Sequence, residues 1–256
     1  MDTSILSLLY IFIGFSWWVV ALTFGLPITV LLLLSKNFRS AFFSWVYANV
    51  AEPLQRTKVC IIRKKAFQIL KDSLGDRNSL VPLEILEIGV GQGPNLQFYP
   101  KNCNLTALDK NKFFEKDFLR NRKKNPHVSY KKIVIQPAEC MRGVDDNSFD
   151  VVVSTFLHCS CDDSVAVLQE VKRVLKPGGK YLFLDHTGFP EGDIGLHIQR
   201  FFNPLWSLIF DGCFLDRNPS KEIKDAGFSD VQLQKYISPS FRRYLLRHQI
   251  LGIATK

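Results

Sequence analysis

Apolar residues are distributed in three different patterns along the chain. Residues 3–35 contain no charged side chain and are mostly Leu, Ile, Val, Phe and Trp. Between residues 38 and 70, apolar side chains such as Phe38, Phe42 and Trp45 recur at spacings of three to four, which predicts helix. From about residue 75 onward, short apolar runs alternate with amphipathic stretches. This last pattern predicts a regular alternation of strands and helices.

Seven apolar runs in the C-terminal part of the chain predict strands. They are residues 83–88, 104–108, 128–135, 149–153, 180–184, 231–235 and 249–254. Helices are predicted at 112–124 and 163–175. Such β-α-β alternation predicts an α/β fold with a mostly parallel sheet and helices on both faces. No clear helix separates the last two runs, so we expect them to form an antiparallel edge pair.

The first segment, residues 1–35, predicts a hydrophobic membrane anchor, because about 20 apolar residues suffice for a helix to cross a bilayer. Gly25-Leu26-Pro27 interrupts this run. Two geometries remain open: a tilted single span, and a hairpin that bends near Pro27 and returns to the same face. A cleaved signal peptide is disfavoured, because Asp2 is the only early charge and the apolar run exceeds the usual length.

Residues 36–74 predict helices that link the anchor to the following domain. The spacing of their aromatic residues suits an interfacial helix lying against lipid, and the alternative is a core helix that covers the C-terminal domain. Pro53 is expected to divide the segment. Lys36, Arg39 and later basic residues place residues 75–256, the α/β domain, on the cytosolic side of the membrane by the positive-inside rule.

Charge and cysteine content narrow the range of partners. The net charge is +9, but the basic residues form short separate clusters. An anionic membrane surface suits this distribution. No stretch interleaves basic and aromatic residues as a single-strand nucleic-acid groove would, so no nucleic-acid partner is expected. The six cysteines form no CxxC pair and no zinc-site spacing, so we predict no metal site and a reduced compartment. No feature indicates an oligomeric state.

The strongest candidate site follows the strand at 83–88. Gly89, Gly91 and Gly93 alternate there, which allows the backbone to approach a ligand at the carboxyl edge of a sheet. The pattern is not the dinucleotide fingerprint, because position 94 is proline, and no phosphate-binding lysine follows as in an NTPase. Asp109 ends the next strand, where a carboxylate can accept both hydroxyls of a ribose. The pattern predicts a ligand of nucleotide size.

Together with Ala138-Glu139, the Phe-Asp-Val-Val-Val strand at 149–153 and the Lys-Pro-Gly-Gly turn at 176–179, these features resemble class I S-adenosylmethionine methyltransferases. The resemblance implies a Rossmann-like fold and S-adenosylmethionine as cofactor. The residues that it places at the cofactor are Glu87, Gly89, Gly91, Gly93, Asp109, Ala138 and Glu139. In these roles, the glycines border the methionine and adenosyl groups and Asp109 holds the ribose. The Ala-Glu pair lies beside the adenine, and Glu87 supports the loop or the methionine amino group.

A closer similarity covers nearly the whole chain. The apolar N-terminus and residues 95–100, 113–116, 203–206 and 211–213 look like the membrane-anchored thiol S-methyltransferases of the methyltransferase-like group. This similarity implies methylation of small alkyl thiols, at the endoplasmic reticulum membrane or lipid droplets. The alternatives are a lipid, phenol or amine acceptor, and a non-enzymatic membrane protein on the same scaffold. The sequence departs from that group at Val90, Gln92, His158 and Asp185.

Two histidines are candidates for the acceptor end of the site. His158 follows the fourth predicted strand, and His186, preceded by Asp185, follows the fifth. Both positions are at the carboxyl edge of the sheet, where the transferred methyl group is expected. A thiol, with a pKa of about 8.5, is partly ionised at neutral pH and needs little base catalysis. An amine or phenol would depend more on a nearby base.

Overall fold

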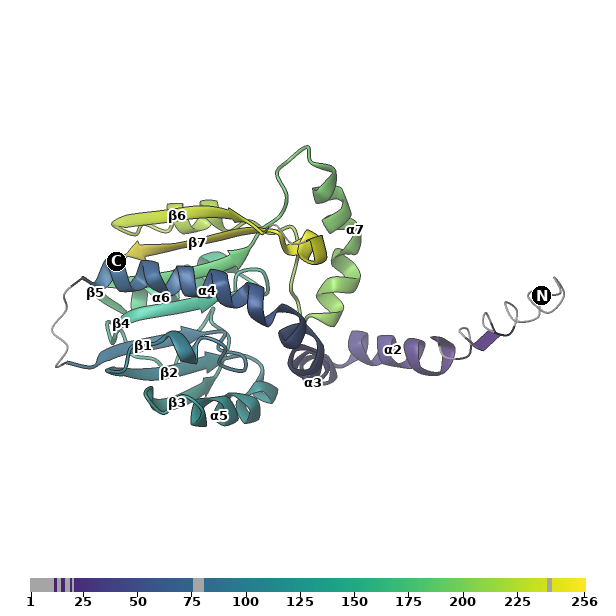
Figure 1. Ribbon diagram of the computed structural model, residues 1–256, viewed down its shortest axis with the longest axis horizontal. Helices are drawn as coiled ribbons and strands as arrows, with labels where there is room; N and C mark the ends of the chain where they lie inside the picture. Colours follow the sequence, from purple (N-terminus) through teal and green to yellow (C-terminus); the bar gives the residue numbers. More distant parts are fainter. Residues whose placement is uncertain (1–11, 13–14, 17–18, 20, 76–80, 239–240) are drawn as a thin grey trace.

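Seven strands form one sheet in the computed structural model, which describes residues 12, 15–16, 19, 21–75, 81–238 and 241–256 (Figure 1). The strands are β1 (Leu83–Ile88), β2 (Cys103–Asp109), β3 (Ser129–Ile135), β4 (Phe149–Thr155), β5 (Leu175–His186), β6 (Asp230–Ile237) and β7 (His248–Thr255). Their order in the sheet is β3-β2-β1-β4-β5-β7-β6. The first five strands in the chain are parallel, whereas β7 is antiparallel to both β5 and β6. The predicted mostly parallel α/β sheet is confirmed.

The α-helices are α2 (Leu26–Leu34), α3 (Lys36–Val46), α4 (Glu52–Leu74), α5 (Glu115–Lys123), α6 (Ser164–Val174), α7 (Ile194–Ile209) and α8 (Ser220–Asp225). From Ala21 onward, the described residues also form two π-helical turns (Ala21–Gly25, Tyr47–Ala51) and three 3-10 turns (Leu96–Phe98, Lys112–Phe114, Phe241–Leu246). Of the seven strands, β5 departs furthest from its predicted bounds. β5 begins at Leu175, before the Lys-Pro-Gly-Gly turn, because Leu175 pairs with Phe149 ahead of a register shift.

Alternate side chains of the strands point to opposite faces, and each face is covered by helices. Ile85 of β1 belongs to the core that α4 and α5 cover, whereas the next residue, Leu86, belongs to the core beneath α6 and α8. The inner strands are apolar on both faces because both faces are buried. This arrangement leaves the ends of the strands as the place where a ligand can reach the sheet.

α4 lies along one face of the sheet as a core helix (Figure 1). Ile62, Ala66 and Leu70 follow one another at four-residue spacing, and all three are almost fully buried. Of the two alternatives for residues 38–70, the core helix therefore describes this half of α4. Pro53 is in the first turn of α4, where its missing N–H costs least, and the π-helical turn Tyr47–Ala51 precedes it.

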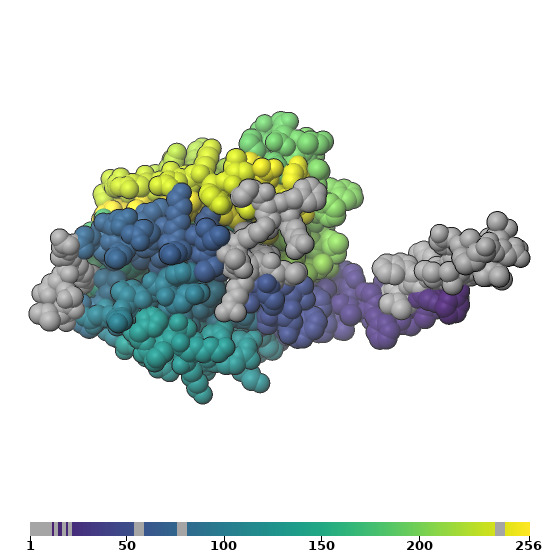
Figure 2. Space-filling model, viewed as in Figure 1, coloured from purple at the N-terminus to yellow at the C-terminus, as the bar shows by residue number. Residues whose placement is uncertain are grey.

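The chain bends sharply between α2 and α3. Ser35 has extended backbone angles at this point, and its hydroxyl caps α3 by accepting a hydrogen bond from the Phe38 N–H. The bend therefore lies at Ser35 rather than near Pro27, which is in the first turn of α2. Figure 2 shows α2 (purple) extending away from the main body. Much of the predicted anchor, including residues 1–11, lies outside the described residues.

Within the described residues, no single helix is both long and apolar enough to cross a bilayer. Leu22–Leu34 and Lys36–Ala51 meet these requirements only as a pair, bent by 119° at the break between them.

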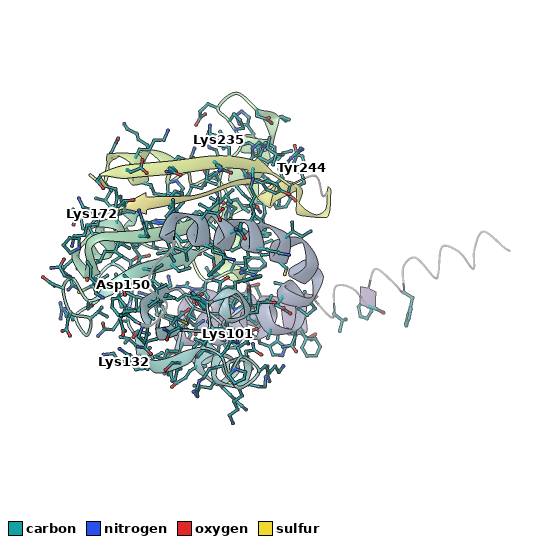
Figure 3. All side chains as sticks on the ribbon, turned by 60° about the vertical axis from the view of Figure 1, so that its left-hand side comes forward. Lys101, Lys132, Asp150, Lys172, Lys235 and Tyr244 are labelled. Carbon is teal, nitrogen blue, oxygen red and sulfur yellow. The ribbon has the colours of Figure 1, made fainter. Side chains whose placement is uncertain are left out.

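Each of the two edge strands carries a lysine. Lys132 is on β3 and Lys235 is on β6, at opposite edges of the sheet (Figure 3). Charged side chains on an edge strand oppose its pairing with another chain. The labelled lysines of Figure 3 lie on separate parts of the surface, so they do not form a single basic stripe.

Two neighbouring isoleucines of α4 test the role of this helix. Ile62 is 2% exposed and Ile61 is 62% exposed. We expect Ile62→Ala to lower the free energy of unfolding by about 2–5 kcal/mol, because it leaves a cavity against the sheet. The matched Ile61→Ala change should stay within about 0.5 kcal/mol of the parent. Urea unfolding of both variants measures the difference, and equal effects would contradict the packing of α4.

Candidate active site

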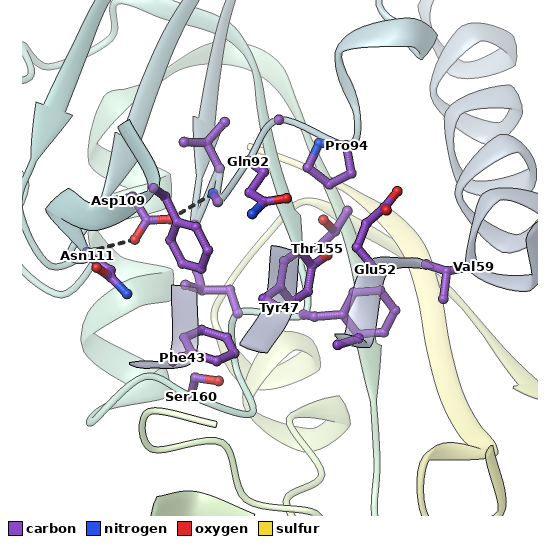
Figure 4. A pocket seen from close by; sticks show the side chains of 18 of the residues that line it. Phe43, Tyr47, Glu52, Val59, Gln92, Pro94, Asp109, Asn111, Thr155 and Ser160 are labelled. Carbon is purple, nitrogen blue, oxygen red and sulfur yellow. Dashed lines mark hydrogen bonds between the residues drawn. The ribbon is translucent and has the colours of Figure 1, made fainter. Parts of the chain in front are cut away.

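A cavity of about 640 Å³ lies at the carboxyl ends of β1, β2, β4 and β5, where α3 and the start of α4 cover it. This volume is within the range of small-molecule sites, about 300–1,000 Å³. Figure 4 shows Asp109 with its two hydrogen bonds and, on the same cavity, the aromatic side chains of Phe43 and Tyr47. The predicted site residues that line this cavity are Gly89, Gly91, Gly93, Asp109, Ala138, Glu139 and His186.

The glycine-rich loop adopts a conformation that other residues rarely adopt. Gly91 has a φ of +52°, and a Cβ atom there would meet nothing within 4 Å. That open space belongs to the cavity, so a ligand can lie directly against the backbone. Gly93, at a φ of +74°, is instead packed, since a Cβ there would be 2.6 Å from a methyl carbon of Leu96. One glycine thus makes room for the ligand and the other for the core.

Asp109 holds the loop at its open side. One carboxylate oxygen accepts a hydrogen bond from the Gly91 N–H at 2.8 Å, and the other accepts one from the Asn111 N–H at 2.8 Å. The side chain is buried yet lines the cavity. Burial raises the pKa of Asp109 to about 6, against the lowering effect of the two N–H donors. The carboxylate is therefore ionised and able to accept further hydrogen bonds at neutral pH.

Glu87 supports the loop through residues that follow it in the chain, and it does not line the cavity. Its two oxygens accept hydrogen bonds from the Asn95 side-chain amide at 2.7 Å and from the Tyr99 hydroxyl at 2.8 Å. The same amide nitrogen also donates to the Thr155 hydroxyl at 3.0 Å. Burial raises the pKa of Glu87 to about 7. Of the two predicted roles of Glu87, support of the loop matches this geometry.

Arg63 of α4 is a cavity residue that the sequence analysis missed. Its side chain is buried, and its guanidinium lies over the ring of Phe156, 5.5 Å from the centroid. Among the described residues, its Nε has no hydrogen-bond partner. A buried cation with an unpaired donor is suited to an anionic ligand group such as a carboxylate. The available signal was its spacing, because Arg63 shares one helix face with the buried Val59, Ala66 and Leu70.

Ala138 and Glu139 line the cavity from the loop after β3. The Glu139 carboxylate accepts a hydrogen bond from the Asp162 N–H at 2.7 Å. This bond ties the loop after β3 to the loop after β4. Both residues line the same cavity as the glycine-rich loop, and their contact with adenine stays a prediction.

Another part of the cavity wall combines aromatic surface with sulfur and imidazole groups, and there Phe156 stacks on His186 with ring centroids 6.4 Å apart. Its aromatic residues include Phe43, Tyr47, Phe114, Phe156 and Phe210.

His186 Nε2 lies 3.2 Å from the Cys213 sulfur, and Cys159 is next to both. A hydrogen bond from Cys159 and the neighbouring His186 hold the pKa of Cys213 well below its usual range, although burial opposes this effect. Sequence spacing did not identify Cys213, which follows α7 and is far from β4 and β5 in the chain.

His158 and Asp185 do not line the cavity, in contrast to the prediction for these two residues. The chain turns at Phe156, whose φ is +58°, and the His158 ring packs behind the site. There its two ring nitrogens are hydrogen bonded to Ser164 and Tyr181, and burial lowers its pKa to about 4. The Asp185 carboxylate accepts hydrogen bonds from the backbone N–H groups of His158 and His186. It positions these loops and forms a hydrogen bond with the Cys159 thiol, although it does not line the cavity itself.

α3 is fixed across the cavity by polar contacts. Arg39 forms an ion pair with Asp211 at 3.3 Å, and the Ser40 hydroxyl donates to the same carboxylate at 2.8 Å. The Asn111 side chain donates to the Ser40 carbonyl oxygen. The helix that follows the apolar α2 therefore forms one wall of the site.

Comparison with known proteins identifies the family. Residues 86–183 match a methyltransferase domain model. The chain is 36% identical to the thiol S-methyltransferase TMT1B of Rattus norvegicus over 93% of this chain and 96% of the relative. It is also 36% identical to the human thiol S-methyltransferase TMT1A, over 76% of this chain and 78% of that protein. The chain belongs to the thiol S-methyltransferase family. It is an S-adenosylmethionine-dependent methyltransferase.

A solved structure supports the fold. A Haemonchus contortus phosphoethanolamine N-methyltransferase 2 in complex with S-adenosyl-L-methionine superposes with a TM-score of 0.55 at 16% identity. The match covers 84% of this chain and 60% of that chain. Identity this low shows the shared fold alone.

The residues of this methyltransferase fit S-adenosylmethionine. The open space at Gly91 admits the ligand against the loop, and the ionised Asp109 is placed to accept ribose hydroxyls. The unpaired Nε–H of Arg63 would donate a hydrogen bond to the methionine carboxylate. The ribose hydroxyls would thus meet a hydrogen-bond acceptor and the carboxylate a cation, at separate points of one cavity.

Replacement of Asp109 tests the ribose contact. We expect Asp109→Asn to weaken S-adenosylhomocysteine binding about 10- to 100-fold, since hydrogen bonds to a charged acceptor contribute about 1.5–3 kcal/mol. Because the parent carboxylate titrates at about 6, its affinity should fall as the pH drops below that value. The Asn variant should lose this step. Calorimetry between pH 5 and 8 measures both effects.

Asp145→Asn, on an exposed loop, is the control and should bind like the parent. An Asp109→Asn variant with parental affinity and parental pH dependence would show that the ribose is held elsewhere.

Proposed function

We propose that the enzyme transfers the methyl group of S-adenosylmethionine to a small apolar thiol at the cytosolic face of a membrane. The observation that carries this proposal is the acceptor end of the cavity. Aromatic side chains surround a small polar group there, composed of His186, Cys213 and Cys159. The names of the relatives support a thiol as acceptor. Such an end suits an apolar acceptor with one polar reacting atom better than a highly charged one.

Methyl transfer requires this chain mainly to position the acceptor and to exclude water from the site. When bound, S-adenosylmethionine supplies a methyl group that is already activated on a sulfonium. Phe43, Tyr47 and Phe210 enclose the acceptor end and keep water away from it. A thiol must lose its proton to react, and the polar group at His186 Nε2 and the Cys213 sulfur is at the place where this happens. His158 takes no part in this step, because its ring is hydrogen bonded behind the site.

A panel of acceptors tests the substrate class. Purified full-length enzyme in detergent is given labelled S-adenosylmethionine with matched alkyl thiols, phenols and amines. We expect label in the thioether product, with rates that rise with the apolar surface of the thiol, because the acceptor end is aromatic. Asp109→Ala should abolish transfer at cofactor concentrations that saturate the parent. Label found only in a phenol, amine or lipid product would contradict the thiol assignment but not the assignment of the cofactor site.

The proposed membrane contact rests on an apolar surface next to the site. Leu33 and Leu34 of α2 are 63% and 81% exposed, and Phe201 of α7 is 79% exposed. α7 packs against both α2 and α3, so these side chains belong to neighbouring helices. Exposed apolar patches of this kind are found where proteins contact membranes. We place the enzyme on the endoplasmic reticulum membrane or on lipid droplets, with α3 between the lipid and the cavity.

Vesicle flotation tests this contact. We expect the full chain to float with neutral lipid vesicles, and a variant without residues 1–34 to stay in the dense fraction, because it lacks the apolar α2 and the segment before it. Binding of S-adenosylhomocysteine by the shortened variant checks that it is folded. If the shortened variant floats as completely as the full chain, the N-terminal segment is not the anchor.

A further inference from the structure

Three metal-ligating side chains gather at the acceptor end of the cavity. The Cys159 sulfur, the His186 ring nitrogen and the Cys213 sulfur all lie within 4.8 Å of one another. They come from three separate elements: the loop after β4, the end of β5 and the loop after α7. Because the three are far apart in the chain, no local Cys/His spacing could have indicated the cluster.

The composition of this cluster matches a catalytic zinc site rather than a structural one. Structural zinc has four protein ligands, whereas catalytic zinc has three and leaves the fourth position open. Two cysteines and one histidine form one of the known catalytic sets. Zinc bond lengths of about 2.0–2.3 Å place the donor atoms of a tetrahedral site about 3.5–3.8 Å apart. His186 Nε2 and the Cys213 sulfur are already 3.2 Å apart, and no two of the three donor atoms are more than 4.8 Å apart, so small side-chain shifts would reach that geometry.

The surroundings of the cluster support the same conclusion. All three residues line the cavity, so the open position faces the space where the acceptor binds. Cys159 and His186 are both almost fully buried. The Asp185 carboxylate accepts hydrogen bonds from the backbone N–H groups of His186 and of His158, the residue before Cys159. This shared contact holds two of the three ligand-bearing segments in place, as supporting contacts do around metal sites.

We propose that Cys159, His186 and Cys213 bind the borderline-soft cation Zn²⁺, and that its open position binds the sulfur of the acceptor. The proposal deepens the thiol methyltransferase function and rests on it. A cation that prefers sulfur ligands also explains the selection of a thiol over a phenol or amine in an otherwise aromatic end of the cavity.

The bonds and protons of this step balance. The S–H bond of the acceptor breaks as its sulfur binds the cation, and the proton leaves to solvent. The new S–CH₃ bond forms while the bond from the cofactor sulfur to the methyl carbon breaks, and the electron pair of that bond stays on the cofactor sulfur. The product is a neutral thioether, which binds the cation more weakly than a thiolate and can leave.

Metal analysis of the full-length protein tests the site without any assay of methyl transfer. The chain is expressed with added zinc, purified in detergent and analysed for metal. We expect about one zinc ion per chain. Cys213→Ser and Cys159→Ser should weaken zinc binding at least about 100-fold, more than the loss of a supporting contact would. Cys140→Ser, a half-buried cysteine outside the cluster, should keep its zinc.

A second measurement uses the unaltered chain, in case a cysteine variant does not fold. Apo protein titrated with Co²⁺ alone should develop sulfur-to-cobalt charge-transfer absorption with the intensity of two thiolate ligands. Retained S-adenosylhomocysteine binding by Cys213→Ser would show that the variant is folded. A chain that takes up neither zinc nor cobalt, or that carries a Cys159–Cys213 disulfide in its active form, overturns the proposal.

The failure of this proposal differs from the failure of the proposed function. Thiol methylation that persists in zinc-free protein and resists chelators overturns the metal role and leaves the thiol assignment standing. A chain that binds zinc through these three residues but methylates only phenols or amines overturns the acceptor role of the cation, together with the thiol assignment.

Discussion

Two buried carboxylates hold the glycine-rich loop in the shape on which the rest of the site depends. Asp109 accepts a hydrogen bond from the Gly91 N–H within the loop. Glu87 supports the loop by accepting hydrogen bonds from Asn95 and Tyr99, which follow it. Both groups are ionised only against the cost of burial, so their pKa values are raised. The nearby cation Arg63 partly offsets that cost at Glu87. Asp109 and Arg63 thus give the cavity a hydrogen-bond acceptor and a cation at separate points, where the ribose hydroxyls and the carboxylate of one cofactor can bind.

The acceptor end has a different construction. It is assembled from the loop after β4, the end of β5, the loop after α7 and the wall formed by α3, and polar contacts such as Arg39–Asp211 join these segments. α3 directly follows the apolar α2, so the part of the chain proposed to contact lipid and the part that encloses the acceptor are continuous. An apolar acceptor dissolved in the bilayer would therefore meet the site close to the membrane surface.

Local sequence patterns predicted the features that depend on local physics. The strands follow from short apolar runs, and the glycine-rich loop follows from the conformational freedom of glycine. The structure confirms the mostly parallel sheet. The position of His158 was mispredicted, because a single left-handed residue, Phe156, reverses the direction of the chain just before it. Arg63 and Cys213 were missed because their roles depend on what packs beside them. Arg63 had one local signal, its spacing on the buried face of α4, but its place in a basic cluster favoured a surface position. A single cysteine after a helix carries no local sign of a buried cavity wall.

The structure of the complex with S-adenosylhomocysteine tests the central claim most directly, namely that the cavity at the carboxyl ends of the strands is the methyl-transfer site. The account predicts ribose hydroxyls within hydrogen-bond distance of Asp109, the carboxylate of the ligand near Arg63, and its sulfur directed toward His186 and Cys213. A ligand bound elsewhere would contradict this account. So would a ligand in the cavity with its sulfur directed away from the aromatic end.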